Sequence, residues 1–114
     1  MILLLLLLFS FSFSYDIKRT AECIVRESRK LNLDPVFFTA LLKAESSLHP
    51  YALCVSKNGQ VVASYFPKDP QSAKRIAQEW ISLGYNVDIG IAQINHRNLR
   101  RFSVSIDMAL DPCV

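Results

Sequence analysis

The sequence has few of the residues that build metal sites or flexible loops. Its 114 residues include three cysteines and two histidines, but there is no C-x-x-C pair. Neither His49 nor His96 lies near a second candidate ligand, so the pattern argues against a metal site. Only three glycines occur, and no internal repeat or low-complexity segment follows residue 14. We therefore expect one folded domain that uses no metal and no other cofactor.

Charge is also scarce. The chain has 13 basic and 10 acidic side chains, and its net charge is +3. This excess is too small and too dispersed to indicate nucleic-acid binding. It favours an anionic polymer such as a cell wall, although an ordinary solvated surface is the better explanation of the charge by itself.

The one long apolar run lies at the N-terminus, where Met1 to Phe13 carries no charged side chain. It is shorter than the roughly 20 residues that a membrane-spanning helix needs, and Ser12 and Ser14 are small residues at the positions that a signal peptidase reads. We expect residues 1–14 to be a cleaved export signal and residues 15–114 to be the domain. Because no Lys or Arg precedes the run, an uncleaved membrane tether is the alternative.

Export makes a disulfide plausible among Cys23, Cys54 and Cys113. An odd number leaves one thiol unpaired in this chain. That thiol is either free or has its partner outside this sequence.

Three helices are predicted in the first two thirds of the domain. The first runs from about Asp16 to Lys30, and its apolar stripe consists of Ile17, Ala21, Ile24, Ser28 and Leu31. The second runs from Pro35 to about Ser47 after an Asp34 N-cap. The third follows Asp69-Pro70 and ends at Gly84, with a buried stripe of Ala73, Ile76, Ala77, Trp80 and Leu83.

Between the second and third helices, two short β-prone runs flank Asn58-Gly59, which is a strong hairpin signal. Near the C-terminus, Ser105 can cap a short helical turn that ends before Pro112. The pattern as a whole predicts an α+β fold that is mainly helical, with one small β-hairpin.

Glu45 is the candidate for chemistry. It lies seven positions after Phe38, two helical turns on, so we expect it to project from the apolar face that includes Leu41 and Leu42. A carboxyl group on such a face is either buried or lines a cleft, and apolar surroundings favour its protonated form. A protonated acid is what the cleavage of a glycosidic bond requires, although a structural role explains the position as well.

The order of several motifs resembles the lysozyme-like lytic transglycosylases, especially the small exported members that accompany type IV secretion, conjugation and pilus systems. The resemblance spans nearly the whole domain. The motifs that carry it are Asp34-Pro35, Glu45-Ser46-Ser47, Pro50-Tyr51-Ala52, Tyr85 to Gly90, Gln93-Ile94-Asn95 and Asp111-Pro112-Cys113.

The resemblance implies a lysozyme-like fold and an exported, periplasmic enzyme that acts on peptidoglycan. Glu45 would protonate the oxygen between N-acetylmuramic acid and N-acetylglucosamine, and then accept the proton of the muramyl C6 hydroxyl as a 1,6-anhydro end forms. Ser46, Gly90, Gln93 and Asn95 would bind the sugar. Structural roles are equally good explanations for Ser46 and Gly90 and a close alternative for Asn95, whereas we favour function for Gln93.

Two other functions fit the same residues. A hydrolytic lysozyme would use Asp88 as a second carboxylate, although we expect Asp88 to cap a turn. Family members usually continue past Cys113 through further helices that complete the cleft, so we expect a chain truncated relative to the family. A wall-binding or assembly component without catalysis is therefore the main alternative. The basic stretch from Arg97 to Arg101 would meet wall peptides or simply be solvated.

Overall fold

The computed structural model describes residues 17–114, and the predicted export signal lies outside the described residues. Two helical segments come first, residues 17–30 and α2 (Pro35–Ser46). A hairpin of β1 (Leu53–Lys57) and β2 (Gln60–Tyr65) leads to α3 (Pro70–Ser82). The chain continues through β3 (Asn86–Ile89), β4 (Ile94–Asn95), α4 (His96–Arg101) and α5 (Ile106–Ala109). Helices and a small antiparallel sheet make an α+β architecture.

The sheet has four strands in the order β2-β1-β3-β4, all antiparallel. The predicted hairpin is present, and both Asn58 and Gly59 have positive φ angles of 53° and 78° at its turn. Strands β3 and β4 were not predicted, because a four-residue and a two-residue strand give no clear alternation. The sheet is therefore larger than the single predicted hairpin. Strand β1 also pairs with β3, from Leu53 opposite Ile89 to Ser56 opposite Asn86.

Capping residues set the helix starts where the sequence predicted them. The Asp34 carboxylate accepts a hydrogen bond from the Val36 N–H at 2.8 Å, and Asp69 accepts one from the Ser72 N–H at 2.7 Å. The Ser105 hydroxyl accepts one from the Met108 N–H at 3.1 Å. These three N-caps confirm the predicted beginnings of α2, α3 and α5.

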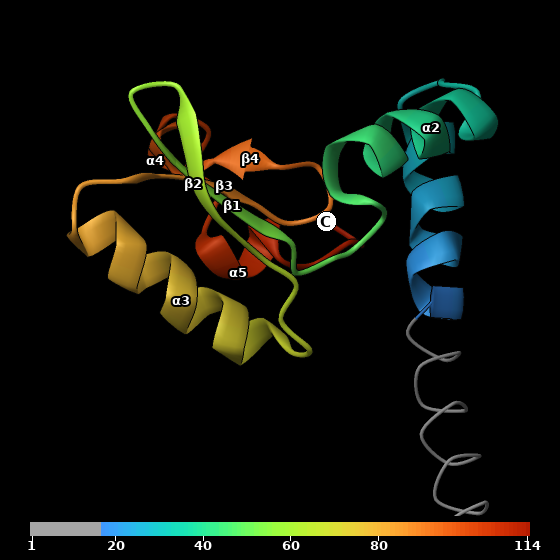
Figure 1. Ribbon diagram of the computed structural model, residues 1–114. Helices are drawn as coiled ribbons and strands as arrows, with labels where there is room; N and C mark the ends of the chain where they lie inside the picture. The colour runs from blue at the N-terminus through green and yellow to red at the C-terminus, as the bar shows by residue number, and fades with distance from the viewer. Residues whose placement is uncertain (1–16) are drawn as a thin grey trace, which may run out of the picture.

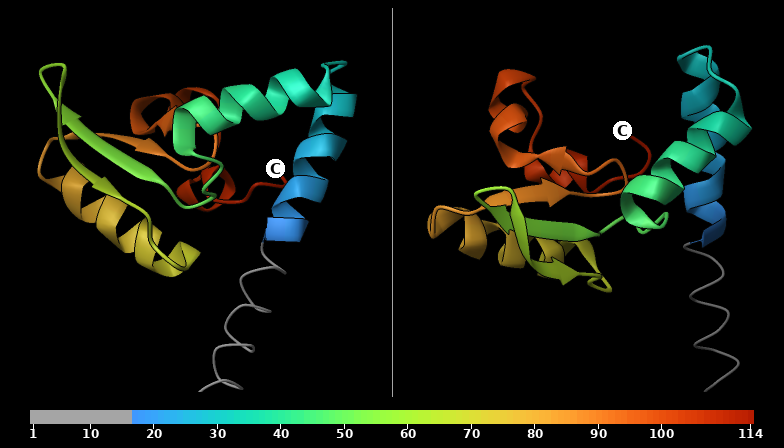
Figure 2. Two further views of the ribbon diagram at one scale, coloured as in Figure 1. Left: turned by 45° about the vertical axis from the view of Figure 1, so that its right-hand side comes forward. Right: turned by 45° about the horizontal axis from the view of Figure 1, so that its top comes forward.

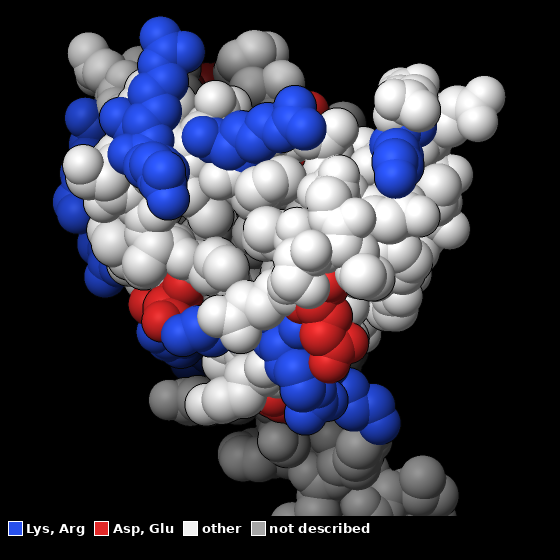
Figure 3. Space-filling model, turned by 90° about the vertical axis from the view of Figure 1, so that its left-hand side faces the viewer, with Lys and Arg blue, Asp and Glu red and all other residues white. Residues whose placement is uncertain are grey.

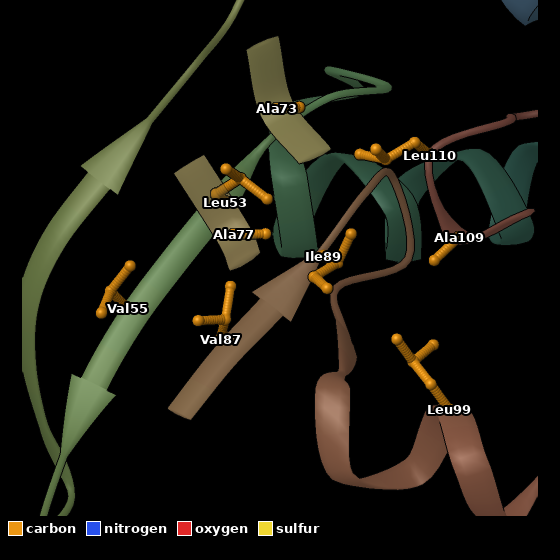
Figure 4. Close-up of a cluster of buried hydrophobic side chains, with 9 residues drawn as sticks. All are labelled: Leu53, Val55, Ala73, Ala77, Val87, Ile89, Leu99, Ala109 and Leu110. Carbon is orange, nitrogen blue, oxygen red and sulfur yellow. The ribbon is translucent and has the colours of Figure 1, made fainter. Parts of the chain in front are cut away.

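The main core lies between the sheet, α3 and the C-terminal helices (Figure 4). Its buried members are Leu53, Val55, Ala73, Ala77, Val87, Ile89, Leu99, Ala109 and Leu110. Trp80 packs against this cluster and its indole N–H donates to the Tyr65 hydroxyl at 3.0 Å, which supports its predicted role as a core anchor. Leu83 was wrongly placed in the buried stripe of α3, because it follows the last helical turn and is 66% exposed.

The first two helical segments form a separate arm beside the sheet (Figures 1 and 2). A second, smaller cluster of Ile24, Leu42 and Ile91 joins them to the sheet region, with Phe38 and Leu48 packed against it. The predicted stripe of the first helix was partly wrong, since Ile17 and Leu31 are exposed. Ala21 is exposed as well, whereas Ile24 and Ser28 are buried as predicted. Thr20 and Cys23 complete the buried side, because Cys23 faces the C-terminal segment.

A disulfide between Cys23 and Cys113 ties this arm to the C-terminal turn. Arg19 and Asp111 form an ion pair at 3.8 Å between the same two segments. Cys54 is the free thiol and is half-buried in β1. No helix within residues 17–114 has the length and apolar character needed to cross a membrane.

Candidate functional site

Glu45 lies in the last turn of α2, just before two residues with left-handed backbone conformation, Ser47 (φ 55°) and Leu48 (φ 63°). Its side chain is exposed, and within residues 17–114 its carboxylate forms no hydrogen bond and no ion pair. Leu42 is buried, but Leu41 is 47% exposed. Of the two expected positions of Glu45, buried or lining a cleft, the structure excludes burial, because the helix buries the neighbouring side that includes Leu42 and Ser46. A position in a cleft stays a prediction.

Ser46 points into the protein. It is 5% exposed, and its hydroxyl donates to the Leu42 carbonyl oxygen at 3.0 Å. Ser46 therefore lies on the buried side of α2, together with Leu42. Its contact is a helix-internal bond of the kind that Ser makes to the residue four positions earlier. A contact between Ser46 and the sugar stays a prediction.

Gly90 follows β3 at a point where the backbone must turn in a small space. Its φ is 82°, and its N–H donates to the Ala52 carbonyl oxygen at 2.8 Å. A Cβ added to Gly90 would overlap the carbonyl oxygen of Ala109 in α5. The structure therefore gives Gly90 a packing role, and its contact with a sugar stays a prediction.

Gln93 holds the loop that Gly90 begins. Its side-chain amide donates to the Ala52 carbonyl oxygen at 3.0 Å and to the Gly90 carbonyl oxygen at 2.9 Å. Its own backbone has a positive φ of 51°. The amide nitrogen of Gln93 is thus used within the protein. Its amide oxygen accepts no hydrogen bond within residues 17–114 and is the atom left for a ligand.

Asn95 and Asp88 face each other across β3 and β4. The Asn95 amide donates to the Asp88 carboxylate at 3.0 Å, and the Asn95 carbonyl oxygen caps α4 by accepting from the Arg97 N–H at 3.0 Å. Asp88 was predicted to cap a turn, but it lies within β3 and its carboxylate accepts from Asn95. Asn95 is the N-cap of α4, a role that was not predicted. Binding of a sugar by Asn95 stays a prediction.

One apolar contact brings the two predicted halves of the site together. Ile91, at the start of the Gly90 to Gln93 loop, is 8% exposed and packs with Leu42 of α2. Leu42 lies one turn before Glu45, so the loop meets α2 beside the turn that carries Glu45. This contact joins Leu42 and Ile91, which lie more than forty positions apart in the sequence.

His49 is a residue that the sequence analysis considered only as a metal ligand. Its Nδ1 accepts a hydrogen bond from the Tyr51 N–H at 3.1 Å, and its ring packs edge-on against Phe66 with centroids 5.4 Å apart. Burial lowers the pKa of His49 below its ordinary value of 6.5. The bond and the low pKa both favour neutral imidazole four residues after Glu45. His49 followed by Pro50, just after a capped helix, is a sequence signal for the point where α2 joins the sheet region.

Glu45 lines neither of two surface hollows in the described part of the chain. One lies beside the first helix, and the other is bounded by Arg19, Tyr51, Gln71 and Asp107. No three His, Cys, Asp or Glu side chains within residues 17–114 are grouped so that they could hold a metal ion.

The predicted basic stretch forms helix α4, where Arg97, Arg100 and Arg101 are exposed. Figure 3 shows one face of the molecule on which Lys and Arg side chains cover more area than Asp and Glu. The distribution is compatible with both predicted roles, a solvated surface and contact with an anionic polymer.

Comparisons with known proteins place the sequence near one group. No family model and no solved structure matches the chain. Proteins named type IV secretion system protein virB1 from Brucella abortus biovar 1 (strain 9-941), Brucella suis biovar 1 (strain 1330) and Brucella melitensis biotype 1 are each 34% identical over 79 residues. The match covers 69% of this chain and 32% of each relative, so the chain spans about a third of their length. Over that stretch the chain is a partial homologue of virB1.

Proposed function

We propose that the chain provides the acid/base helix of a peptidoglycan lytic transglycosylase that opens the cell wall for a type IV secretion system. The similarity to virB1 proteins carries the second half of this proposal, because their name places them in that system. The contact of the Gly90 to Gln93 loop with α2 supports the first half, because it brings both family motifs to one place. Action on the wall would require export to the periplasm, which the predicted signal in residues 1–14 would provide.

The chemistry needs one carboxyl group. Glu45 gives its proton to the glycosidic oxygen as the bond to the anomeric carbon of N-acetylmuramic acid breaks. The C6 hydroxyl of the same sugar then attacks that carbon, and the Glu45 carboxylate takes the hydroxyl proton. The carboxyl group is regenerated, a 1,6-anhydro end forms, and no water is consumed.

The exposure of Glu45 supports its access to a polymer, since a glycan strand needs an open surface. The exposed side of α2 and the free amide oxygen of Gln93 would contact the strand. Asn95 would act at the edge of the same region, with Asp88 as its hydrogen-bond partner rather than as a second catalytic carboxylate.

The exposure also favours a second candidate, a wall-binding or assembly component without catalysis. Glu45 is exposed, whereas the general acid of lysozyme lies in a hydrophobic pocket. A hydrolytic lysozyme that uses Asp88 is the third candidate, and it would produce reducing ends instead of anhydro ends.

Digestion of purified sacculi distinguishes these candidates. We expect 1,6-anhydromuropeptides in the mass spectrum of the soluble products, and we expect Glu45→Gln to abolish them. Glu79→Gln is the matched control, because Glu79 is an exposed glutamate on another helix. Binding to sacculi without any soluble product would support the assembly component, and anhydro products that persist in Glu45→Gln would refute the role of Glu45.

A further inference from the structure

The disulfide between Cys23 and Cys113 is a covalent link between the helical arm and the sheet region. Figure 2 shows the C-terminal segment leaving α5 and running back to the first helix. The arm also meets the rest of the chain in the small cluster around Ile91 and in the ion pair between Arg19 and Asp111. Both side chains of that pair are well exposed, so the pair contributes little. The disulfide is the strongest of these connections.

The sheet region has a core of its own. All nine buried residues of the main cluster lie between Leu53 and Leu110, so none of them belongs to the arm. Their burial does not require the arm to stay in place. We therefore expect that opening the disulfide moves the arm while the sheet region stays folded.

The disulfide lies next to the contact that joins the two halves of the candidate site. Ile24, the residue after Cys23, packs with Leu42 of α2 and with Ile91. Ile91 belongs to the loop that Gln93 holds, and Leu42 lies one turn before the turn of Glu45. The bond thus fixes the first helix where that helix helps to hold α2 against the loop.

The two sulfur atoms of the disulfide have different surroundings. Cys23 is 4% exposed, whereas Cys113 is half-buried, so an attacking thiol reaches the Cys113 sulfur more readily. The Arg26 guanidinium lies 3.9 Å from the Cys23 sulfur, and the Glu27 carboxylate lies 3.7 Å from Arg26 Nε and helps to orient it. A cation beside a sulfur stabilises the thiolate form. Cys113 is therefore the better target, and Cys23 is the better leaving group.

We propose that the Cys23–Cys113 disulfide is a redox latch that a dithiol reductant opens. One thiolate of the reductant attacks Cys113 Sγ and bonds to it, and Cys23 leaves as a thiolate beside Arg26. The second thiolate of the reductant then attacks the reductant's own sulfur in this mixed disulfide and releases Cys113. The reductant is oxidised to a disulfide, the two cysteines are reduced, and they take up the two protons that the dithiol loses.

Opening the latch has a consequence for Glu45, which rests on the function proposed above. In that function, Glu45 and the amide oxygen of Gln93 act on one glycan strand, so they must keep their relative position. A misplacement of about 1 Å lowers the rate of an enzyme by about 100-fold. The latch therefore makes cleavage of the wall depend on oxidation, and the reduced protein is the inactive form.

Hydrogen exchange of the purified protein, with and without dithiothreitol, tests the release of the arm. We expect faster exchange after reduction in residues 17–30 and in α2, unchanged protection in β1 and β3, and recovery after oxidation with glutathione disulfide. The matched controls are Cys54→Ser, which should respond as the parent does, and the double variant Cys23→Ser with Cys113→Ser, which should not respond to dithiothreitol. Unchanged exchange in the arm overturns the proposal, and so does an equal loss of protection in β1 and β3.

Thiol trapping tests the chemical step. In a Cys54→Ser background, reaction with excess glutathione and a quench with N-ethylmaleimide should leave glutathione on Cys113 and maleimide on Cys23, as peptide mapping would show. Arg26→Gln should slow reduction by about threefold, because the leaving thiolate loses its cation. Arg29→Gln removes an exposed charge from the same helix and should leave the rate unchanged. Glutathione found mainly on Cys23, or equal rates in the two arginine variants, overturns this step.

The sacculus assay tests the link to activity. We expect dithiothreitol to lower the release of anhydromuropeptides by about 100-fold in the parent. The Cys54→Ser variant should lose activity in the same way. An arm that loosens while product release stays constant overturns the control of the site by the latch. Hydrogen exchange and thiol trapping need no activity, so the latch and the role of Glu45 can fail separately.

Discussion

The sheet region and the helical arm bury their apolar residues to very different extents. The sheet region encloses nine buried apolar residues in one cluster, and five of them are 0% exposed. The arm shares a cluster of three and leaves Phe37 and Val36 in solvent. Burial of apolar area is the main stabilising term, so the sheet region can hold its own shape. The arm instead depends on the disulfide and on its contact with Ile91.

Removing the disulfide should have the largest effect. Cys23 and Cys113 are separated by 90 positions, and closing a loop of that length stabilises a protein by about 4 kcal/mol. We expect Cys23→Ser with Cys113→Ser to lower the free energy of unfolding by about that amount in urea titrations. Hydrogen exchange should rise most in residues 17–30. Equal acceleration of hydrogen exchange in β1 and in the arm would contradict the difference between the sheet region and the arm.

A core truncation in the sheet region should come next. Ile89 is 0% exposed at the centre of the sheet, so Ile89→Ala should lower the free energy of unfolding by about 3 kcal/mol. Leu41→Ala removes a similar side chain that is 47% exposed, and it should cost less than about 1 kcal/mol. Urea denaturation of both variants measures the difference. Similar losses would show that α2 is covered in solution.

Acid should weaken the junction between the two regions. Burial lowers the pKa of His49, so the unfolded chain binds a proton more readily than the folded chain. Stability is therefore complete above the ordinary pKa of 6.5 and is lost as the pH falls through it toward the lower folded value. Losing the Tyr51 N–H bond to His49 should cost about 1 kcal/mol.

His49→Asn is the variant that isolates this effect, because an Asn side chain keeps an acceptor but does not titrate. The loss of stability between about pH 7.5 and pH 5 should be smaller in His49→Asn than in the parent. His96 retains its own titration in both proteins, with burial and the Arg97 charge lowering its pKa and Asp88 opposing them. Equal losses in parent and variant would rule out His49 as the acid-sensitive group.

The smallest effect is expected for the ion pair between Lys74 and Asp107. Their charged atoms are 2.9 Å apart and join α3 to α5, but the side chains are 39% and 67% exposed. Such pairs contribute about 0 to 1 kcal/mol and are screened by salt. A double-mutant cycle with Lys74→Ala and Asp107→Ala measures the coupling. A value above about 2 kcal/mol would mean that the sheet region also depends on charge.

Local signals predicted the helix starts and the hairpin, whereas partners distant in sequence decided the rest. The caps at Asp34, Asp69 and Ser105 act on residues two or three positions away, so they can be read directly from the sequence. β3 and β4 become strands because β1 and each other supply hydrogen bonds, which no local pattern records. Leu83 is exposed because it falls past the end of α3.

In the candidate site, too, local patterns predicted some features and contacts distant in sequence decided the others. Helical spacing identified α2 as the helix that carries Glu45. The exposure of Glu45, however, depends on whether another segment covers its side of the helix. Gly90 was predicted from a motif, whereas its tight packing against Ala109 depends on the position of α5. The capping role of Asn95 could have been predicted, since Asn directly before a basic helix is a common N-cap.

The disulfide also changes what a protease would release. Cys23 and Cys113 enclose almost the whole described chain in one covalent ring, which includes the exposed turn at Asn58 and Gly59. A single cut at that turn would open the ring without separating the two pieces. The nicked protein would keep its mass under non-reducing conditions and would divide into two fragments only after reduction.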